Sequence, residues 1–85
     1  MLRDTFDGGA LTIAILHLNQ GTRIEDASKD MYRKHSNTYD DDNIVEQWIN
    51  AANYSIEFVR STYPEKDEEF HMAFLTKLAF TALAY

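Results

Sequence analysis

The chain has 85 residues, of which 45% are hydrophobic and 26% charged, and its formal net charge is −6. This length suits one domain, residues 1–85, and the hydrophobic content argues against disorder. The excess of acids disfavours non-specific binding to nucleic-acid phosphates, and the lack of cysteine excludes disulfides and thiolate metal sites. No apolar run reaches the roughly 18 residues of a membrane span, so we expect a cytoplasmic protein without membrane contact.

A first helix is predicted over residues 9–19. Its core, ALTIAILHL at positions 10–18, is a short apolar run that fits a helix or a buried strand. Gly21 follows it, and glycine suits the left-handed conformation that ends many helices. Because no other segment reads as a partner strand, we interpret the run as a helix.

A second helix is predicted over residues 23–35. Thr22 and Glu25 have the T-x-x-E spacing of a capping box, and the apolar stripe that follows is narrow. We therefore expect this helix to be the most solvent-exposed of the four. It carries a basic cluster, interleaved with Asp26 and Asp30, that consists of Lys29, Arg33 and Lys34.

The third predicted helix, residues 42–61, is expected to organise the chain. When its residues are placed about 100° apart on a helical wheel, apolar side chains, including Trp48, fill roughly half the circumference. An arc this wide is best buried against two or more neighbouring helices. The acidic run from Asp40 to Asp42, followed by Asn43, suits helix capping and the positive end of the helix dipole.

The last helix is predicted over residues 65–84, with Pro64 in its first turn. From Phe70 onward its sequence, FHMAFLTKLAFTALA, is apolar in nearly every direction. A short chain has little material to cover such a helix, so we expect a homo-oligomer, a C₂ dimer, that buries part of it. In the alternative, Phe6 and the N-terminal residues cover that side in a monomer. The predicted interface consists of Phe70, Phe74, Phe80, Leu83 and Tyr85.

Together these elements predict an all-α fold, a compact four-helix bundle-like domain. No internal repeat, linker or low-complexity tract divides the chain. The predicted core draws on all four helices and comprises Ile13, Leu16, Ile24, Met31, Val45, Trp48, Ile49, Ala52, Ile56, Val59, Phe74, Leu75 and Leu78.

Patterns that would indicate catalysis or a cofactor are weak. His17, His35 and His71 fall on three different predicted helices, and Glu68-x-x-His71 supplies only half of the ligand set of a di-iron carboxylate bundle. The acidic run at 40–42 lacks the alternating ligands and the glycine of a calcium loop. We therefore expect no enzymatic activity, no cofactor and no metal.

The preferred functional hypothesis is a small, acidic, non-enzymatic module that binds another protein. Such a module could inhibit or adapt a nucleic-acid-handling complex by presenting carboxylates to its basic surface. The analogy with phage-encoded inhibitors rests on composition. Helix capping and solubility are the alternative interpretation of each acid in the predicted contact set, which is Asp40, Asp41, Asp42, Glu65, Asp67, Glu68 and Glu69.

Two alternatives remain open. Residues 14–32 fit a helix-turn-helix DNA-binding regulator that would use the basic cluster, although the aspartates opening the next helix would meet phosphates badly. The stretch from Tyr39 to Val59, with DDDNIVEQWINAANYSIEFV, and the Ala-rich apolar helix near the C-terminus resemble the small helical head–tail connector proteins of tailed phages. That resemblance covers less than half of the chain and implies an oligomeric structural protein.

Overall fold

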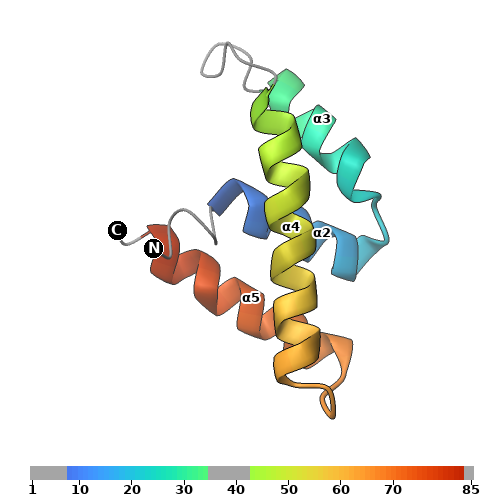
Figure 1. The fold of residues 1–85 in the computed structure, drawn as a ribbon, viewed down its shortest axis with the longest axis vertical. Helices are drawn as coiled ribbons and strands as arrows, with labels where there is room; N and C mark the ends of the chain where they lie inside the picture. Colours follow the sequence, from blue (N-terminus) through green and yellow to red (C-terminus); the bar gives the residue numbers. More distant parts are fainter. Residues whose placement is uncertain (1–7, 35–42, 84–85) are drawn as a thin grey trace.

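The computed structural model describes residues 8–34 and 43–83. Within these ranges the chain forms four α-helices and no strand, which confirms the predicted all-α, bundle-like fold (Figure 1). The helices are α2 (Gly8–Gln20), α3 (Ile24–Lys34), α4 (Asn43–Thr62) and α5 (Glu68–Leu83).

Helix α2 lies at the centre of the packing. It contacts α3, α4 and α5, and in Figure 1 it crosses behind α4. Ala10, Leu11, Ile13 and Ala14 are all fully buried, so this helix presents apolar side chains to more than one neighbour. Leu11 and Ile13 are also among the largest fully buried side chains of the described residues.

Helix α4 buries the face that its periodicity predicts. Trp48 is only 3% exposed, and Ala52, Ile56 and Val59 lie beneath the same face. The helix packs on α2, α3 and α5, so the wide apolar arc is covered by several neighbours, as its width indicates. The hydroxyl of Ser55, also fully buried, donates to the carbonyl of Ala51 at 2.8 Å, which satisfies its polar group inside the core.

The predicted core is largely confirmed. Its fully or almost fully buried members are Ile13, Trp48, Ala52, Ile56, Val59 and Leu75. Others are half-buried against that cluster, namely Ile24, Met31, Phe74 and Leu78, while Leu16, Val45 and Ile49 are also half-buried. The prediction omitted four buried hydrophobic residues, all from α2 and α3: Ala10, Leu11, Ala14 and Ala27.

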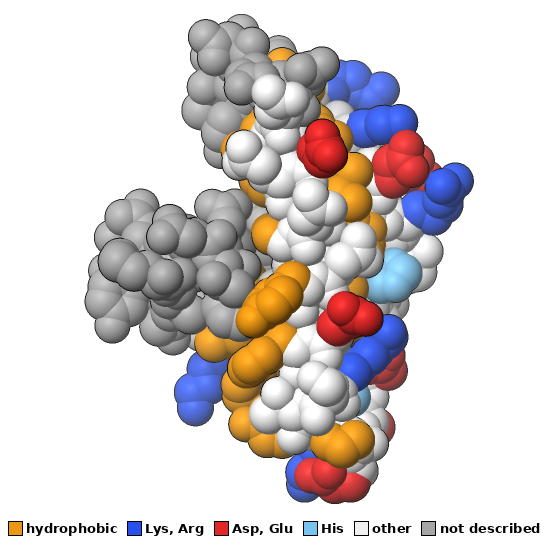
Figure 2. Space-filling view, in the orientation of Figure 1, with side chains coloured by type: hydrophobic (Ala, Val, Ile, Leu, Met, Phe, Trp, Pro, Cys, Tyr) orange, Lys and Arg blue, Asp and Glu red, His pale blue; other side chains and the backbone are white. Residues whose placement is uncertain are grey.

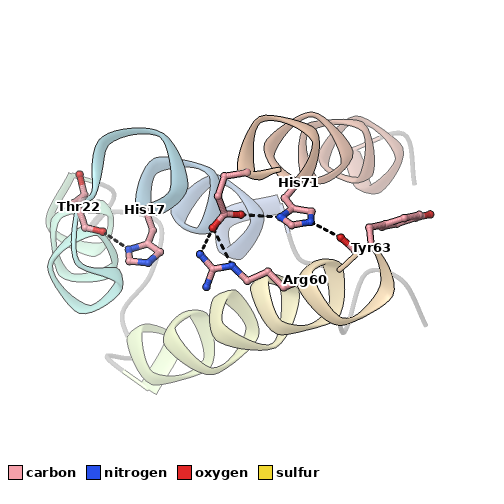
Figure 3. Close-up of polar contacts among 6 residues, drawn as sticks. His17, Thr22, Arg60, Tyr63 and His71 are labelled. Carbon is pink, nitrogen blue, oxygen red and sulfur yellow. Dashed lines mark hydrogen bonds and ion pairs between the residues drawn. The ribbon is translucent and has the colours of Figure 1, made fainter. Parts of the chain in front are cut away.

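The end of α2 follows the predicted glycine cap. Gly21 has a φ of 74°, in the left-handed region, and its N–H donates to the carbonyl of His17 at 2.9 Å. The His17 ring lies next to the same turn, with Nδ1 2.9 Å from the carbonyl oxygen of Thr22 (Figure 3). These two contacts close the helix and direct the chain into α3 after three residues.

The start of α5 differs from the prediction. The sequence placed it at residue 65, but the helix begins at Glu68. Pro64 instead lies in a turn closed by the N–H of Lys66, which donates to the carbonyl of Tyr63 at 3.1 Å. Asp67 then caps the helix, because its Oδ1 accepts the N–H of Phe70 at 2.9 Å. The proline ring favours the second position of such a turn, and Asp67 is well suited to cap a helix that begins at the next residue.

The described helices are too short or too polar to cross a membrane.

Candidate functional site

A shallow groove lies on the exposed side of α4 near its C-terminal end. We call it the aromatic groove; its volume is about 710 Å³, and it is lined by Tyr54, Glu57, Phe58, Arg60 and Ser61. The rings of Tyr54 and Phe58 are stacked, with centroids 6.4 Å apart and an interplanar angle of 17°. Figure 2 shows hydrophobic side chains gathered along this half of α4, on the side facing α5.

The two rings come from positions one helical turn apart, so they occupy the same face of α4. Tyr54 is 51% exposed, which is high for a large aromatic side chain, whereas Phe58 is half-buried. Neither residue belongs to the contact set predicted from the sequence. Their i,i+4 spacing could have indicated a pair of neighbouring rings, but the same spacing is equally typical of residues at the edge of the buried face.

A network of four residues joins the end of α4 to the start of α5. We call it the joint: Arg60, Tyr63, Glu68 and His71. Arg60 Nε donates to Glu68 Oε1 at 3.0 Å, and Arg60 Nη2 donates to the same oxygen. Glu68 Oε2 lies 2.7 Å from His71 Nδ1, and His71 Nε2 lies 2.8 Å from the carbonyl oxygen of Tyr63. Figure 3 shows Arg60 reaching from α4 and His71 from α5 toward one carboxylate.

The joint is buried at one end and exposed at the other. His71 is 5% exposed, while the side chains of Arg60 and Glu68 are about half exposed. The hydrogen bond to Glu68 raises the pKa of His71, and the carbonyl of Tyr63 adds to that effect. The hydrogen bond from Arg60 lowers the pKa of Glu68, and His71 lowers it further. Each charged group therefore stabilises the charged form of its neighbour.

Next to the joint, aromatic rings fill the space between the two helices. The Tyr63 ring lies 5.1 Å from that of Phe70 and 5.0 Å from that of Phe74, measured between centroids. Lys66 Nζ lies 5.3 Å from the centroid of Phe70. Phe70 and Phe74, both predicted at a dimer interface, thus make contacts within their own chain and are half-buried.

The other predicted interface residues are less enclosed or lie outside the description. Phe80 is 70% exposed. The side chain of Leu83 and the whole of Tyr85 are outside the described residues.

The predicted acidic contact set divides into groups. Asp67 caps α5, and Glu68 belongs to the joint. The side chains of Glu65 and Glu69 are exposed and have no hydrogen bond or ion pair within residues 8–34 and 43–83. Residues 40–42 lie outside the described part of the chain. The structure thus gives two of the four described acids a role in the fold.

The histidine and carboxylate pattern does not form a metal site in the described segments. Glu68 and His71 bond to each other. No group of three or more histidine, cysteine, aspartate or glutamate side chains there is arranged to hold a metal ion. His35 lies outside the described residues.

A second groove, of about 600 Å³, runs between α2 and α3 beside the basic cluster. The positive charges of the cluster are paired with carboxylates of the same helix. Lys29 Nζ lies 2.9 Å from Glu25 Oε1, while Arg33 Nη2 and Lys34 Nζ lie 3.0 Å and 3.1 Å from the carboxylate oxygens of Asp30. The hydrogen bond from Lys29 lowers the pKa of Glu25. The exposed face of α3 is therefore a mixture of both signs, a poor match for phosphates. The lining of the groove comprises Leu16, Gln20, Thr22, Asp26, Ala27, Asp30, Met31, Arg33 and Lys34.

Comparisons with protein families, with curated proteins and with solved structures each give no match. Function is therefore inferred from the aromatic groove and the joint.

Proposed function

We propose that the chain is a non-enzymatic module that binds another protein through the aromatic groove. The observation that carries the proposal is the exposed Tyr54 ring, stacked on Phe58 at the edge of an open groove. Tyrosine is enriched at the energetic centres of protein interfaces, because it offers a large rigid surface with a polar tip. Two adjacent rings on one helix provide such a centre.

Charge favours a basic partner. The chain carries a formal charge of −6, and Glu57 lines the groove itself. Glu65, in the turn after α4, and Glu69, in the first turn of α5, add exposed carboxylates. An acidic module of this kind is suited to the basic surface of a nucleic-acid-handling complex, as an inhibitor or an adaptor. The proposal keeps the cytoplasmic location expected from the sequence.

The alternatives have less support. DNA binding through α3 would require Lys29, Arg33 and Lys34 to exchange their present carboxylate partners for phosphates. Self-association through α5 is supported by the exposed ring of Phe80 and is compatible with partner binding at α4. We retain a dimer through this helix as part of the proposal.

The test compares proteins captured from a lysate of the source cells by three immobilised forms of the chain. They are the wild type, Tyr54→Ala and the matched control Asn50→Ala, which changes an exposed residue one turn earlier on α4. We expect a partner that the wild type and the control retain and Tyr54→Ala loses. Equal capture of the partner by all three forms would refute the proposal that the groove binds it.

The captured partner is then purified and its affinity measured by calorimetry. Truncation of a central interface residue costs about 2 kcal/mol or more, which is about 30-fold in Kd. Tyr54→Ala should therefore bind at least about 30-fold more weakly, while Asn50→Ala should bind like the wild type. Far-UV circular dichroism of each variant shows whether a loss of binding reflects a loss of fold.

A further inference from the structure

The buried ring of His71 faces a hydrogen-bond acceptor at each of its nitrogens. Nδ1 lies 2.7 Å from a carboxylate oxygen of Glu68, and Nε2 lies 2.8 Å from the carbonyl oxygen of Tyr63. Neither oxygen can donate when Glu68 is ionised, and a neutral imidazole has only one N–H. Only the doubly protonated imidazolium satisfies both contacts at these distances.

The charged groups around this ring come from helices α4 and α5, and the turn between them supplies the uncharged carbonyl of Tyr63. Glu68 lies on α5 itself, and Arg60 reaches in from α4 to bond the same carboxylate. Helix α2 also packs on α5, but its one titratable side chain is His17, whose Nδ1 is engaged with Thr22. Helix α3 packs on α2 and α4. The network therefore consists of cation, anion and cation in sequence: His71, Glu68 and Arg60.

We propose that the joint is a proton-sensitive connection between α4 and α5. In the folded protein His71 is an imidazolium that bonds Glu68 and the end of α4 together. When His71 loses its proton, one of its two nitrogens presents a lone pair to an acceptor, and that contact is lost. The start of α5 is then held to the end of α4 by fewer bonds, and the joint loosens.

The direction of the pH dependence follows from the two shifted pKa values. The pKa of His71 is raised above its usual 6.5, so its contribution to stability is complete below about pH 6.5 and is lost as pH rises through the folded-state pKa. The pKa of Glu68 is lowered from 4.5, so its contribution is present above about pH 4.5 and is lost as pH falls through its folded-state pKa. Both the protonated His71 and the ionised Glu68 are therefore fully present between about pH 4.5 and about pH 6.5.

The joint also reaches the aromatic groove, because Arg60 belongs to both. Glu68 bonds Arg60 through one oxygen and His71 through the other, so a shift of Glu68 when His71 is neutral should move Arg60 and change partner binding at the groove as the pH rises. This consequence rests on the proposed function, whereas the protonation of His71 does not.

The first test is an NMR titration of the histidine ring signals in the full chain, assigned by backbone-to-ring connections. We expect His71 to titrate above pH 6.5, with both nitrogens protonated below its midpoint. Glu68→Gln should lower that midpoint, because the variant removes the carboxylate. Glu69→Gln is the matched control, since it changes the neighbouring exposed acid, and it should leave the midpoint in place. A wild-type midpoint at or below 6.5, or one that Glu68→Gln does not lower, would overturn the proposal.

The second test measures urea unfolding of the wild type, Glu68→Gln and Glu69→Gln from about pH 6 to about pH 9. The unfolding constant of the wild type and of Glu69→Gln should rise with pH across the His71 titration, and Glu68→Gln should show a smaller rise. An equal rise in all three would refute the role of the joint. If the titration behaves as expected and no partner is found, the proposed function fails while the joint stands.

Discussion

Replacing Trp48 with alanine tests the packing of α4 against its neighbours. Trp48 is 3% exposed and lies in the same buried cluster as Ala52 and Ile56. A tryptophan buries about 150–250 Å², and at about 25 cal/mol per Å² this amounts to roughly 4–6 kcal/mol. Alanine retains a part of that area, and measured truncations of large core aromatics cost about 3–5 kcal/mol. We expect Trp48→Ala to lose that amount.

The loss is large relative to the stability available. At about 0.05–0.15 kcal/mol per residue, a domain of this size has roughly 4–13 kcal/mol of unfolding free energy. Urea denaturation followed by far-UV circular dichroism measures the change without the tryptophan signal. Gln47→Ala, at the exposed position next to it, should change stability by no more than about 0.5 kcal/mol. Trp48→Phe should cost less than Trp48→Ala and keeps the comparison measurable if the alanine variant is unfolded. A cost for Trp48→Ala below about 1 kcal/mol would refute the burial argument.

Three further predictions concern helix ends and assembly. Gly21→Ala should destabilise the protein by about 1 kcal/mol in urea denaturation, because φ is 74° while the added methyl meets nothing within 4 Å; no change would mean that the turn relaxes at no cost. Asp67→Ala should cost about 1 kcal/mol in the same assay and Asp67→Asn much less, because the cap to Phe70 needs a side-chain oxygen; equal costs would exclude the cap. Sedimentation equilibrium should show a dimer that Phe80→Glu dissociates, and a single wild-type species of 9.9 kDa would contradict that assembly.

The sequence was most informative where one face of a helix is buried and the other is not. In α4, polar residues such as Asn50 and Glu57 alternate with the apolar arc at the helical period, so Trp48 and Val59 could be assigned to the core. The i,i+4 pairs on α3 were equally readable, since local spacing alone brings Glu25 to Lys29.

The hydrophobic period could not show which of the two helices that are apolar on nearly all sides would be the more deeply buried. Both α2 and the later part of α5 lack a polar face in the sequence. In the structure α2 is covered by three helices, so Leu11 and Ala14 are fully buried. Helix α5 lies to one side of it, and Phe80 remains exposed. Which of the two helices lies at the centre depends on tertiary packing, and the hydrophobic period of either segment does not reveal it.

The joint could be predicted only in part. The spacing of Glu68 and His71 places them on one helix face, and in the sequence the pair matches half of a metal-binding motif. Their actual partners are Arg60 and the carbonyl of Tyr63, which depend on where α4 ends and how the chain turns. Because the turn at Pro64 delays the start of α5 to Glu68, the two side chains lie against the end of α4.

The joint changes how the acids after α4 should be tested for a role in binding. Asp67 caps α5, and Glu68 bonds His71 in the joint. A loss of binding in variants of either residue would therefore not distinguish a lost contact with the partner from a displaced α5. The side chains of Glu65 and Glu69 carry the same charge, are exposed and form no hydrogen bond or ion pair within the described residues. Neutralising these two leaves the cap and the joint intact. Their effect on the association rate, and its decrease with added salt, therefore measures steering by charge, whereas the effect of Tyr54 on the dissociation rate measures contact in the groove.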